Sequence, residues 1–414
     1  MNGAKNLQIT KEQKITLAVL TLINFFNYVD RQIIFPLFDS IKLEFGVTDF
    51  QLGLLGTLFM LVHAATSVPF GVLADKYSRK MVIAAGVTFW SVVTFLSGLA
   101  GNFKTLLALR SLVGIGEASY APAATAIISD VFPQKIRSQV QGIFNVGMFA
   151  GGTIGVMLGG IIVYYFQSWR IAFFLVAIPG LILALAAAKL KIHTNAEPSK
   201  EIHSIKQTAA KLWKNPAYVW LLISGTLATF AAGTFISWGI EFIHRYKGYN
   251  LRDAALVLGS TMLVAGVLGV ILGSYLADKA YSKFAWGRSM VIALALLLAA
   301  PFALLGVEAG KGIVFVVYFF IATVLLSFYH GPVTAVIHDV VPKHIRATAF
   351  AVYLLVIHLL GDALSPAIIG AISDHSGLKL GMELAVLMIF LSGLALLPVC
   401  HYIRTKKSPL YLTD

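Results

Sequence analysis

The stretch LLALRSLVGIGEASYAPAATAIISDVFPQKIR, residues 106–137, decides how the chain is organised. It is apolar enough to cross a bilayer, yet it carries Arg110 and Glu117 in its interior and Asp130 near its end. Ionisable groups at membrane depth are costly and are first interpreted as functional. Arg110 and Glu117 are seven residues apart (117 − 110), so they share one helical face about two turns apart, and Tyr120 continues that face. The stretch therefore predicts a membrane-spanning helix that forms the polar wall of an internal cavity.

The composition of the whole chain indicates an all-α membrane protein. The chain has 414 residues, of which 58% are hydrophobic and 12% are charged, and a soluble protein of this length would need far more charge on its surface. The net charge of +13 could suit nucleic acid, but most Lys and Arg lie between apolar runs, where they set membrane topology. We therefore expect no nucleic-acid partner. The single cysteine, Cys400, excludes an intramolecular disulfide framework.

The chain contains twelve apolar runs, each about the length that crosses a bilayer. The runs are 15–38, 50–74, 80–100, 104–130, 139–166, 170–190, 216–242, 254–278, 289–306, 311–337, 345–372 and 381–403. The long polar connection 191–215 separates the sixth run from the seventh. We predict an N-terminal six-helix bundle at 1–190, a cytoplasmic linker at 191–215 and a C-terminal six-helix bundle at 216–414.

The charges of the connections predict the orientation. Lys and Arg recur in both termini, in the linker and in every second connection, which favours the cytoplasm for all of these segments. The connection 241–253, which holds Arg245 and Lys247, is an exception to this pattern. The short termini, in which we find no organelle signal, suggest a multi-pass protein of a bacterial inner (plasma) membrane. We expect a monomer surrounded by membrane lipids.

The two halves repeat. Residues 120–137, YAPAATAIISDVFPQKIR, align with residues 329–346, YHGPVTAVIHDVVPKHIR, at an offset of 209 (339 − 130). Residues 71–76, GVLADK, likewise align with 273–279, GSYLADK. Parallel six-helix repeats are typical of one transporter architecture, in which two pseudo-symmetric bundles surround a central site.

The motifs resemble those of the major facilitator superfamily. The resemblance lies in the loop GVLADKYSRK at 71–80, in its degenerate copy at 273–279, and in the glycines of the fifth run, Gly142, Gly151, Gly155, Gly159 and Gly160. Val156 stands where antiporters of the superfamily carry a proline. A finer resemblance, to the spinster-like branch, lies in NYVDR at 27–31, GIGEASY at 114–120 with Pro122, DVFP at 130–133, and GDALSP at 361–366.

The resemblance implies a secondary active transporter that works by alternating access. The spinster-like branch is associated with export of lysolipids and sphingolipids, so it implies an amphiphilic lipid-like substrate, a lysophospholipid or a sphingoid type, with transport coupled to protons. A proton-coupled symporter of small organic anions and a drug/proton antiporter are alternatives within transport. The sequence shows no nucleophile–base constellation, cofactor loop or soluble domain, so we expect no enzyme, no receptor, no cofactor and no metal site.

Four charged residues are the candidates for coupling and binding. The resemblance places the helix with Asp30 and Arg31 beside the helix with Arg110 and Glu117, around the central cavity. We predict that Asp30 and Glu117 carry protons and that Arg31 and Arg110, with Tyr120, bind the anionic headgroup, because a guanidinium binds two oxygens at once. The alternatives are a structural ion pair that joins the two helices, and an Arg110 that only neutralises Glu117.

The second half lacks the mid-helix charges. At the offset of 209, Arg110 corresponds to Phe319 and Glu117 to Leu326. The seventh and tenth runs instead carry aromatic residues, so the predicted cavity has one polar and one apolar wall, which would suit an amphiphile. The predicted substrate contacts in this half are Phe230, Trp238, Phe319, Tyr329 and His330. The alternative is that these aromatic residues face lipid or neighbouring helices.

Charged residues at helix ends form a predicted cytoplasmic gate that breaks as the two bundles rock. The gate residues are Asp75, Arg79, Asp130 and Arg137 in the first half, and Asp278, Asp339 and Arg346, with Arg288, in the second. Ordinary topology-setting charge is the alternative. Histidine as a residue type can sense protons near neutral pH, but for His63, His338 and His358 we expect hydrogen-bonded helix contacts. Asp362, one turn from His358, is a secondary candidate for coupling.

Overall fold

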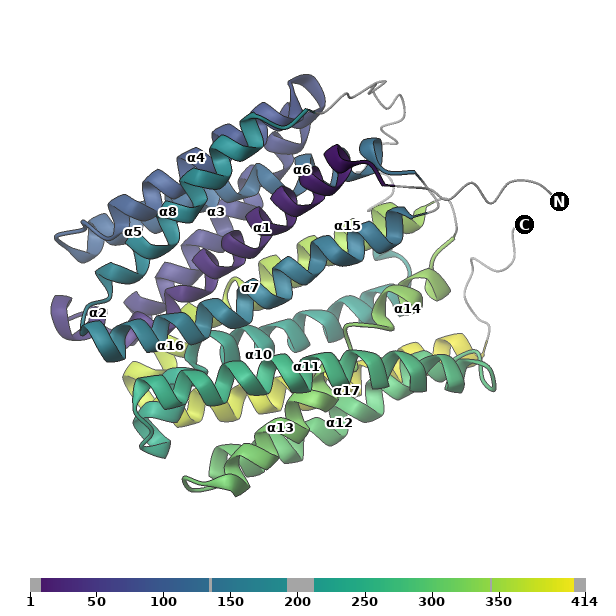
Figure 1. The fold of residues 1–414 in the computed structure, drawn as a ribbon. Coiled ribbons are helices and arrows are strands. Elements are labelled where there is room, and N and C mark those ends of the chain that lie inside the picture. Colours follow the sequence, from purple (N-terminus) through teal and green to yellow (C-terminus); the bar gives the residue numbers. More distant parts are fainter. Residues whose placement is uncertain (1–8, 134–135, 192–211, 343–344, 406–414) are drawn as a thin grey trace. The chain divides into compact units, whose positions relative to one another are not determined.

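The structure, a computed structural model, describes residues 9–133, 136–191, 212–342 and 345–405 (Figure 1). These residues form helices and their connections, and they contain no strand. Most of the predicted linker 191–215 lies outside the described residues. The helices of the first half are α1 (Lys11–Ile33), the short 3-10 helix η1 (Phe35–Leu37), α2 (Phe38–Phe45), α3 (Asp49–Lys76), α4 (Arg79–Ser97), α5 (Phe103–Ala118), α6 (Tyr120–Val131), α7 (Arg137–Phe166) and α8 (Arg170–Ala188).

The second half repeats this series of helices. It contains α10 (Pro216–Lys247), α11 (Leu251–Tyr281), α12 (Gly287–Glu308), α13 (Ile313–Ser327), α14 (Val333–Val340), α15 (Arg346–Ile357), the π-helical turn η3 (His358–Asp362), α16 (Ser365–Ser376) and α17 (Leu378–Arg404). Nine helical stretches of the described chain are long and apolar enough to cross a membrane. The charged helix α1 and the broken pairs α5–α6 and α13–α14 supply three more, which gives the twelve predicted spans.

The run 15–38 changes from α1 to the 3-10 helix η1 near its end, and three other runs that predicted continuous helices are interrupted further inside. The run 104–130 breaks at Ser119, the run 311–337 breaks between Ser327 and Val333, and the run 345–372 contains the π-turn before α16. Each interruption lies just before a proline, at Pro122, Pro332 and Pro366. A proline has no N–H and its ring collides with the carbonyl of the preceding turn. Hydropathy does not detect such breaks because they leave the apolar composition unchanged.

The chain forms two compact units. The first comprises Met1–Ile33, Val62–Leu158 and Ser168–Pro198, and the second comprises Ile34–Leu61, Gly159–Gln167 and Ser199–Asp414. In the first unit α4 packs against both α5 and α8, and α1 packs against α8 (Figure 1). In the second unit α17 lies along α10 and α12, and α13 packs against α11 and α12. The second unit thus also contains residues 34–61 and 159–167 of the first half of the sequence.

Close contact between α7 and α1 sets the position of the charged end of α1. A Cβ atom added at Gly151 would collide with the carbonyl oxygen of Phe25, and one added at Gly155 would lie 2.7 Å from the carbonyl oxygen of Val29. Only glycine permits this approach of two helix backbones. The contact ends directly beside Asp30 and Arg31, so the glycines of α7 determine which way these two side chains point.

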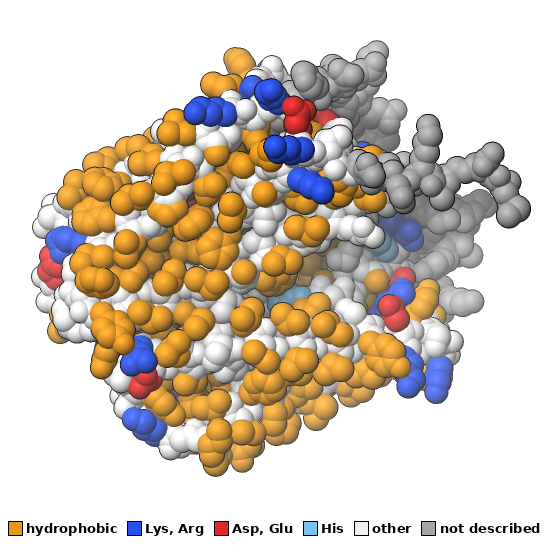
Figure 2. Space-filling view, viewed as in Figure 1, with side chains coloured by type: hydrophobic (Ala, Val, Ile, Leu, Met, Phe, Trp, Pro, Cys, Tyr) orange, Lys and Arg blue, Asp and Glu red, His pale blue; other side chains and the backbone are white. Residues whose placement is uncertain are grey.

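The surface agrees with a bilayer environment. Figure 2 shows hydrophobic side chains along the lengths of the helices, with Lys, Arg, Asp and Glu gathered near the helix ends. Among the described residues, large apolar side chains such as Ile182, Leu185 and Ile271 are more than 60% exposed. Exposed apolar side chains over whole helices are typical of proteins that face lipid.

Candidate functional site

Asp30 and Arg110 form a fully buried ion pair inside the first unit. Arg110 Nη1 donates to Asp30 Oδ1 over 2.7 Å, and Nη2 donates to the carbonyl oxygen of Asp30 over 3.1 Å. The hydroxyl of Thr94 on α4 donates to the other carboxylate oxygen of Asp30. Both charged side chains are 1% exposed. Two charges taken out of water are tolerated only when such hydrogen bonds compensate them, so this pair joins α1 to α5.

Arg31 and Glu117 form a second pair, which is partly accessible. Arg31 Nη2 lies 3.2 Å from Glu117 Oε2; the Arg31 side chain is 15% exposed, and that of Glu117 is buried. The same Nη2 atom lies 3.2 Å from Nε2 of His63 on α3, and the guanidinium lies 4.8 Å from the centre of the Tyr28 ring. The other oxygen of Glu117, Oε1, is buried and accepts no hydrogen bond from the described residues. A proton could therefore bind Glu117 Oε1 without displacing a hydrogen bond from a described residue.

Both pairs join α5 to α1, as in the alternative of a structural ion pair between the two helices. Arg110 and Glu117 share a face of α5, but each makes its ion pair with α1 rather than with the other. Tyr120 lies on the same side and is 1% exposed, and its hydroxyl donates to the carbonyl oxygen of Leu20. Of the predicted contacts in this unit, Arg31 is accessible, whereas Arg110 and Tyr120 are buried among helices.

Of the substrate contacts predicted in the second unit, some side chains are buried among helices and others are exposed. Trp238 is fully buried; its Nε1 donates to the carbonyl oxygen of Pro366 over 3.0 Å, and its ring lies 5.1 Å from that of Phe38. Phe230 and Tyr329 are also buried. Phe319 is partly exposed and packs against Phe235 and Phe315, and His330 is exposed at the break between α13 and α14.

The predicted gate residues pair within each unit, in a repeated pattern. Arg79 on α4 pairs with Asp130 on α6. In the second unit, Arg288 on α12 lies 3.4 Å from Asp339 on α14 and 2.9 Å from Asp278 on α11. Both Arg–Asp pairs obey the offset of 209 (288 − 79 and 339 − 130).

Two further gate arginines repeat in the same way. Arg137 Nη2 donates to the carbonyl oxygen of Ser129 over 2.6 Å, and Arg346 Nη2 donates to that of His338 over 2.9 Å. Each arginine therefore ties the start of one helix back to the end of the helix before it. The side chain of Asp75 lies outside the described residues.

Sequence reasoning missed a cluster around Arg245 at the end of α10. Its guanidinium lies 2.7 Å from both Asp39 and Asp49 and 3.1 Å from Glu241, which is fully buried. Lys42 Nζ lies 2.6 Å from Asp49. The cluster therefore connects residues 39–49 of the first half of the sequence to α10 of the second. The signal in the sequence was the basic connection 241–253, which broke the topology pattern.

Asp374 on α16 extends this connection. Its two carboxylate oxygens accept hydrogen bonds from the backbone N–H groups of Asp49 and Phe50, each over 2.8 Å. These N–H groups begin α3 and have no partners within the helix, so a carboxylate satisfies them and complements the helix dipole. Ser373 Oγ donates to Asp49 Oδ2 over 2.6 Å. Helix α3 thus receives its N-terminal cap from a residue 325 positions away.

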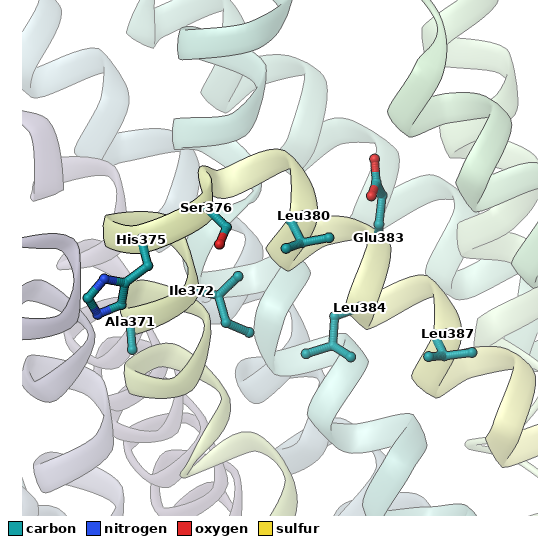
Figure 3. A pocket seen from close by; sticks show the side chains of 8 residues that line it. All are labelled: Ala371, Ile372, His375, Ser376, Leu380, Glu383, Leu384 and Leu387. Carbon is teal, nitrogen blue, oxygen red and sulfur yellow. The ribbon is translucent and has the colours of Figure 1, made fainter.

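An open groove of about 540 Å³ lies between α16 and α17 (Figure 3). It is lined by Ala371, Ile372, His375, Ser376, Leu380, Glu383, Leu384 and Leu387. None of the predicted site residues lines it. Both helices are candidate membrane spans, and exposed leucines such as Leu380 and Leu387 line the groove, so we interpret it as surface in contact with lipid rather than as the transport site.

Comparison with known proteins agrees with these features. The sequence profile described as Major Facilitator Superfamily matches residues 20–366. The chain is 31% identical to Protein spinster of Drosophila melanogaster over 382 residues, which cover 88% of this chain and 63% of that protein. It is 30% identical to Protein spinster homolog 1 of Xenopus laevis over 429 residues, which cover 97% of this chain and 80% of that protein.

A solved structure shares the fold. It is the crystal structure of a bacterial homolog to the human lysosomal transporter Spinster, in an inward-facing and unoccupied conformation. It superposes with a TM-score of 0.85 at 23% identity, over 96% of this chain and 98% of that one. One conclusion follows from these similarities, together with the twelve spans, the repeat at offset 209 and the buried charges of α1 and α5. The chain is a multi-pass membrane transporter that belongs to the Major Facilitator Superfamily and, within it, to the spinster proteins.

Proposed function

We propose that this transporter moves an amphiphilic lipid-like substrate of the lysophospholipid or sphingoid type by alternating access, and that it couples this movement to protons at Glu117. The observation that carries the proposal is the Arg31–Glu117 pair, in which a buried carboxylate faces a partly exposed guanidinium. An anionic headgroup that binds Arg31 competes with Glu117 for the same cation. The carboxylate that loses its partner then favours a proton, because burial disfavours its charge.

The buried pair Asp30–Arg110 has a supporting role in this mechanism. It lies next to Arg31 along α1, and it is sealed from water by α4 and α5. We therefore assign Asp30 and Arg110 to holding α1 in position, so that Arg31 rather than Arg110 contacts the headgroup. His63, hydrogen-bonded to Arg31, would restrain the guanidinium while it changes partner. On the second unit, Phe319 and His330 are the accessible residues of the predicted apolar wall.

The lipid-like substrate is supported by the spinster motifs and by the division of charge between the repeats. Arg110 and Glu117 of α5 correspond to Phe319 and Leu326 of α13, so one half offers charges and the other offers aromatic and aliphatic surface. The rival substrate is a small organic anion, because an exposed arginine suits any carboxylate. The basic connections favour an orientation with both termini in the cytoplasm.

The test is transport by the full chain reconstituted in proteoliposomes. The probe is a fluorescent lysophosphatidylcholine, and its accumulation is measured with and without an imposed proton gradient. We expect wild type to accumulate the probe when the gradient is present. Glu117→Gln should lower gradient-driven accumulation at least tenfold, because the amide cannot take up a proton. Glu308→Gln is the matched control, since this glutamate is exposed at the end of α12 and pairs with the exposed Lys379.

Two outcomes would overturn the proposal. Accumulation by Glu117→Gln equal to that of wild type would remove the coupling role of Glu117. Competition by a short soluble carboxylate, with no dependence on the acyl-chain length of added lysolipids, would replace the lipid-like substrate with a small anion.

A further inference from the structure

The π-helical turn η3 places a histidine and an aspartate together in the middle of the eleventh span. The backbone N–H of Ala363 donates to the carbonyl oxygen of His358 over 3.0 Å, which is the i→i+5 bond of a π-helix. Pro366 has no N–H for the carbonyl of Asp362, and Ser365 Oγ donates to that carbonyl instead, over 3.3 Å. Such single π-turns inside α-helices are often found at functional sites.

The side chains of this turn form a hydrogen-bonded pair beside helix α10. His358 Nδ1 lies 2.9 Å from Asp362 Oδ2. A Cβ atom at Gly233 of α10 would lie 2.8 Å from the Cβ of Asp362, and one at Gly361 would collide with the hydroxyl of Thr229. The π-turn is therefore packed closely against α10 at these two glycines. The second oxygen, Asp362 Oδ1, is buried and accepts no hydrogen bond within the described chain.

The histidine of this pair is accessible. The side chain of His358 is 49% exposed, compared with 27% for Asp362. The exposed His330, at the break between α13 and α14, lies within electrostatic range of His358. Both histidines lie near the middle of membrane spans, where polar groups facing lipid would be costly. We therefore infer that the surface with His330 and His358 is in contact with water rather than with lipid.

Among the described residues, the charged partner available to Asp362 is His358. The helices packed against η3 are α10, α15 and α16. The nearby polar groups are Thr229 of α10, Tyr353 of α15, and Tyr329 and His330 at the α13–α14 break. In the described residues, no Lys or Arg pairs with Asp362. The contrast with Glu117 is direct, because Glu117 is neutralised by an arginine that cannot release its proton, whereas Asp362 depends on an imidazole that can.

We propose that His358 and Asp362 form a second proton-binding site of the transporter, on the half that lacks the buried charges of α1 and α5. One proton from water binds the pair, and the imidazolium and the carboxylate then neutralise each other. This inference rests on the proposed proton coupling. It adds a second pair of residues, in the second half of the chain, that would couple protons to transport.

The transport test compares two activities of the reconstituted full chain, with the same fluorescent lysophosphatidylcholine. His358→Gln and Asp362→Asn should lower gradient-driven accumulation at least tenfold, while exchange of the probe without a gradient stays within twofold of wild type. His375→Gln is the matched control, because His375 is an exposed histidine of α16 with no acidic partner in the described chain. Full accumulation by both variants would overturn the proposal, and so would loss of exchange together with accumulation.

A second measurement needs no substrate, so it separates this inference from the proposed function. Infrared difference spectra of the purified protein between about pH 5 and pH 8, the range in which histidine titrates, report carboxylates that respond to protonation. We expect one carboxylate signal that is absent in Asp362→Asn, absent in His358→Gln and retained in His375→Gln. If wild type transports no lipid probe, the proposed function fails while this signal still decides the inference. An unchanged signal in Asp362→Asn would overturn it.

Discussion

At the scale of single residues, the neighbours Asp30 and Arg31 have different environments although they are adjacent in the chain. Successive residues of a helix point about 100° apart. Asp30 is therefore sealed against Arg110, while Arg31 lies at a partly exposed edge and pairs with Glu117. In the proposed mechanism, Asp30 holds α1 in place and Arg31 contacts the substrate. The two roles could not be separated by counting charges in the sequence.

This difference predicts a large loss of stability when the sealed pair is broken. Arg110→Ala leaves the carboxylate of Asp30 buried without its cation, which should cost about 3–5 kcal/mol. The double variant Asp30→Ala/Arg110→Ala should lose much less than the sum of the two single variants, because neither charge is then left alone. Thermal unfolding of the purified protein checks both expectations. Lys379→Ala, which breaks an exposed pair with Glu308, is the control and should leave the unfolding temperature nearly unchanged, because solvent screens exposed pairs. Equal losses for Arg110→Ala and Lys379→Ala would contradict the assignment.

At the scale of helices, the second unit is held together by contacts between segments far apart in the sequence. The cluster around Arg245 and the cap from Asp374 join the start of α3 to the ends of α10 and α16. With twelve spans, these ends all lie on the membrane side opposite the termini. The contacts therefore fasten these three helix ends to one another within the second unit.

Asp374→Ala should loosen the start of α3. It removes both acceptors of the Asp49 and Phe50 N–H groups, and loss of a helix cap costs about 0.5–2 kcal/mol. Hydrogen–deuterium exchange should show faster exchange in the first turn of α3 and little change in the rest of that helix. Asp253→Ala, at the start of α11, is the control and should leave α3 protected. Unaltered exchange in Asp374→Ala would mean that the cap does not contribute.

At the scale of the whole chain, twelve spans place both ends of the protein on the same side of the membrane. Single cysteines at Glu12, Lys283 and Arg404 should react from one side with a maleimide that cannot cross the membrane. Cysteines at Gly101 and Gly310 should react only from the other side. The native Cys400 is buried, so it should contribute little background. Labelling of Glu12→Cys and Arg404→Cys from opposite sides would contradict twelve spans.

The fold was largely predictable because it depends on local composition. Apolar runs of bilayer length, the repeat at offset 209 and the motifs of the superfamily were sufficient for twelve spans and the correct family. Hydropathy did not reveal the breaks at Ser119 and η3, because backbone geometry near a proline leaves composition unchanged. It also could not show that Trp238 is packed against Phe38 rather than lining a cavity.

The sequence by itself determined that charged residues of α1 and α5 lie at membrane depth, because their positions inside apolar runs are visible in one dimension. Only the tertiary structure decided their partners, namely Arg110 with Asp30 and Glu117 with Arg31. The rotation of α1 about its axis selects these partners, and that rotation is set by the contact of its backbone with Gly151 and Gly155 of α7. Contacts across 325 residues, such as the cap of α3 by Asp374, likewise exist only once the helices are packed.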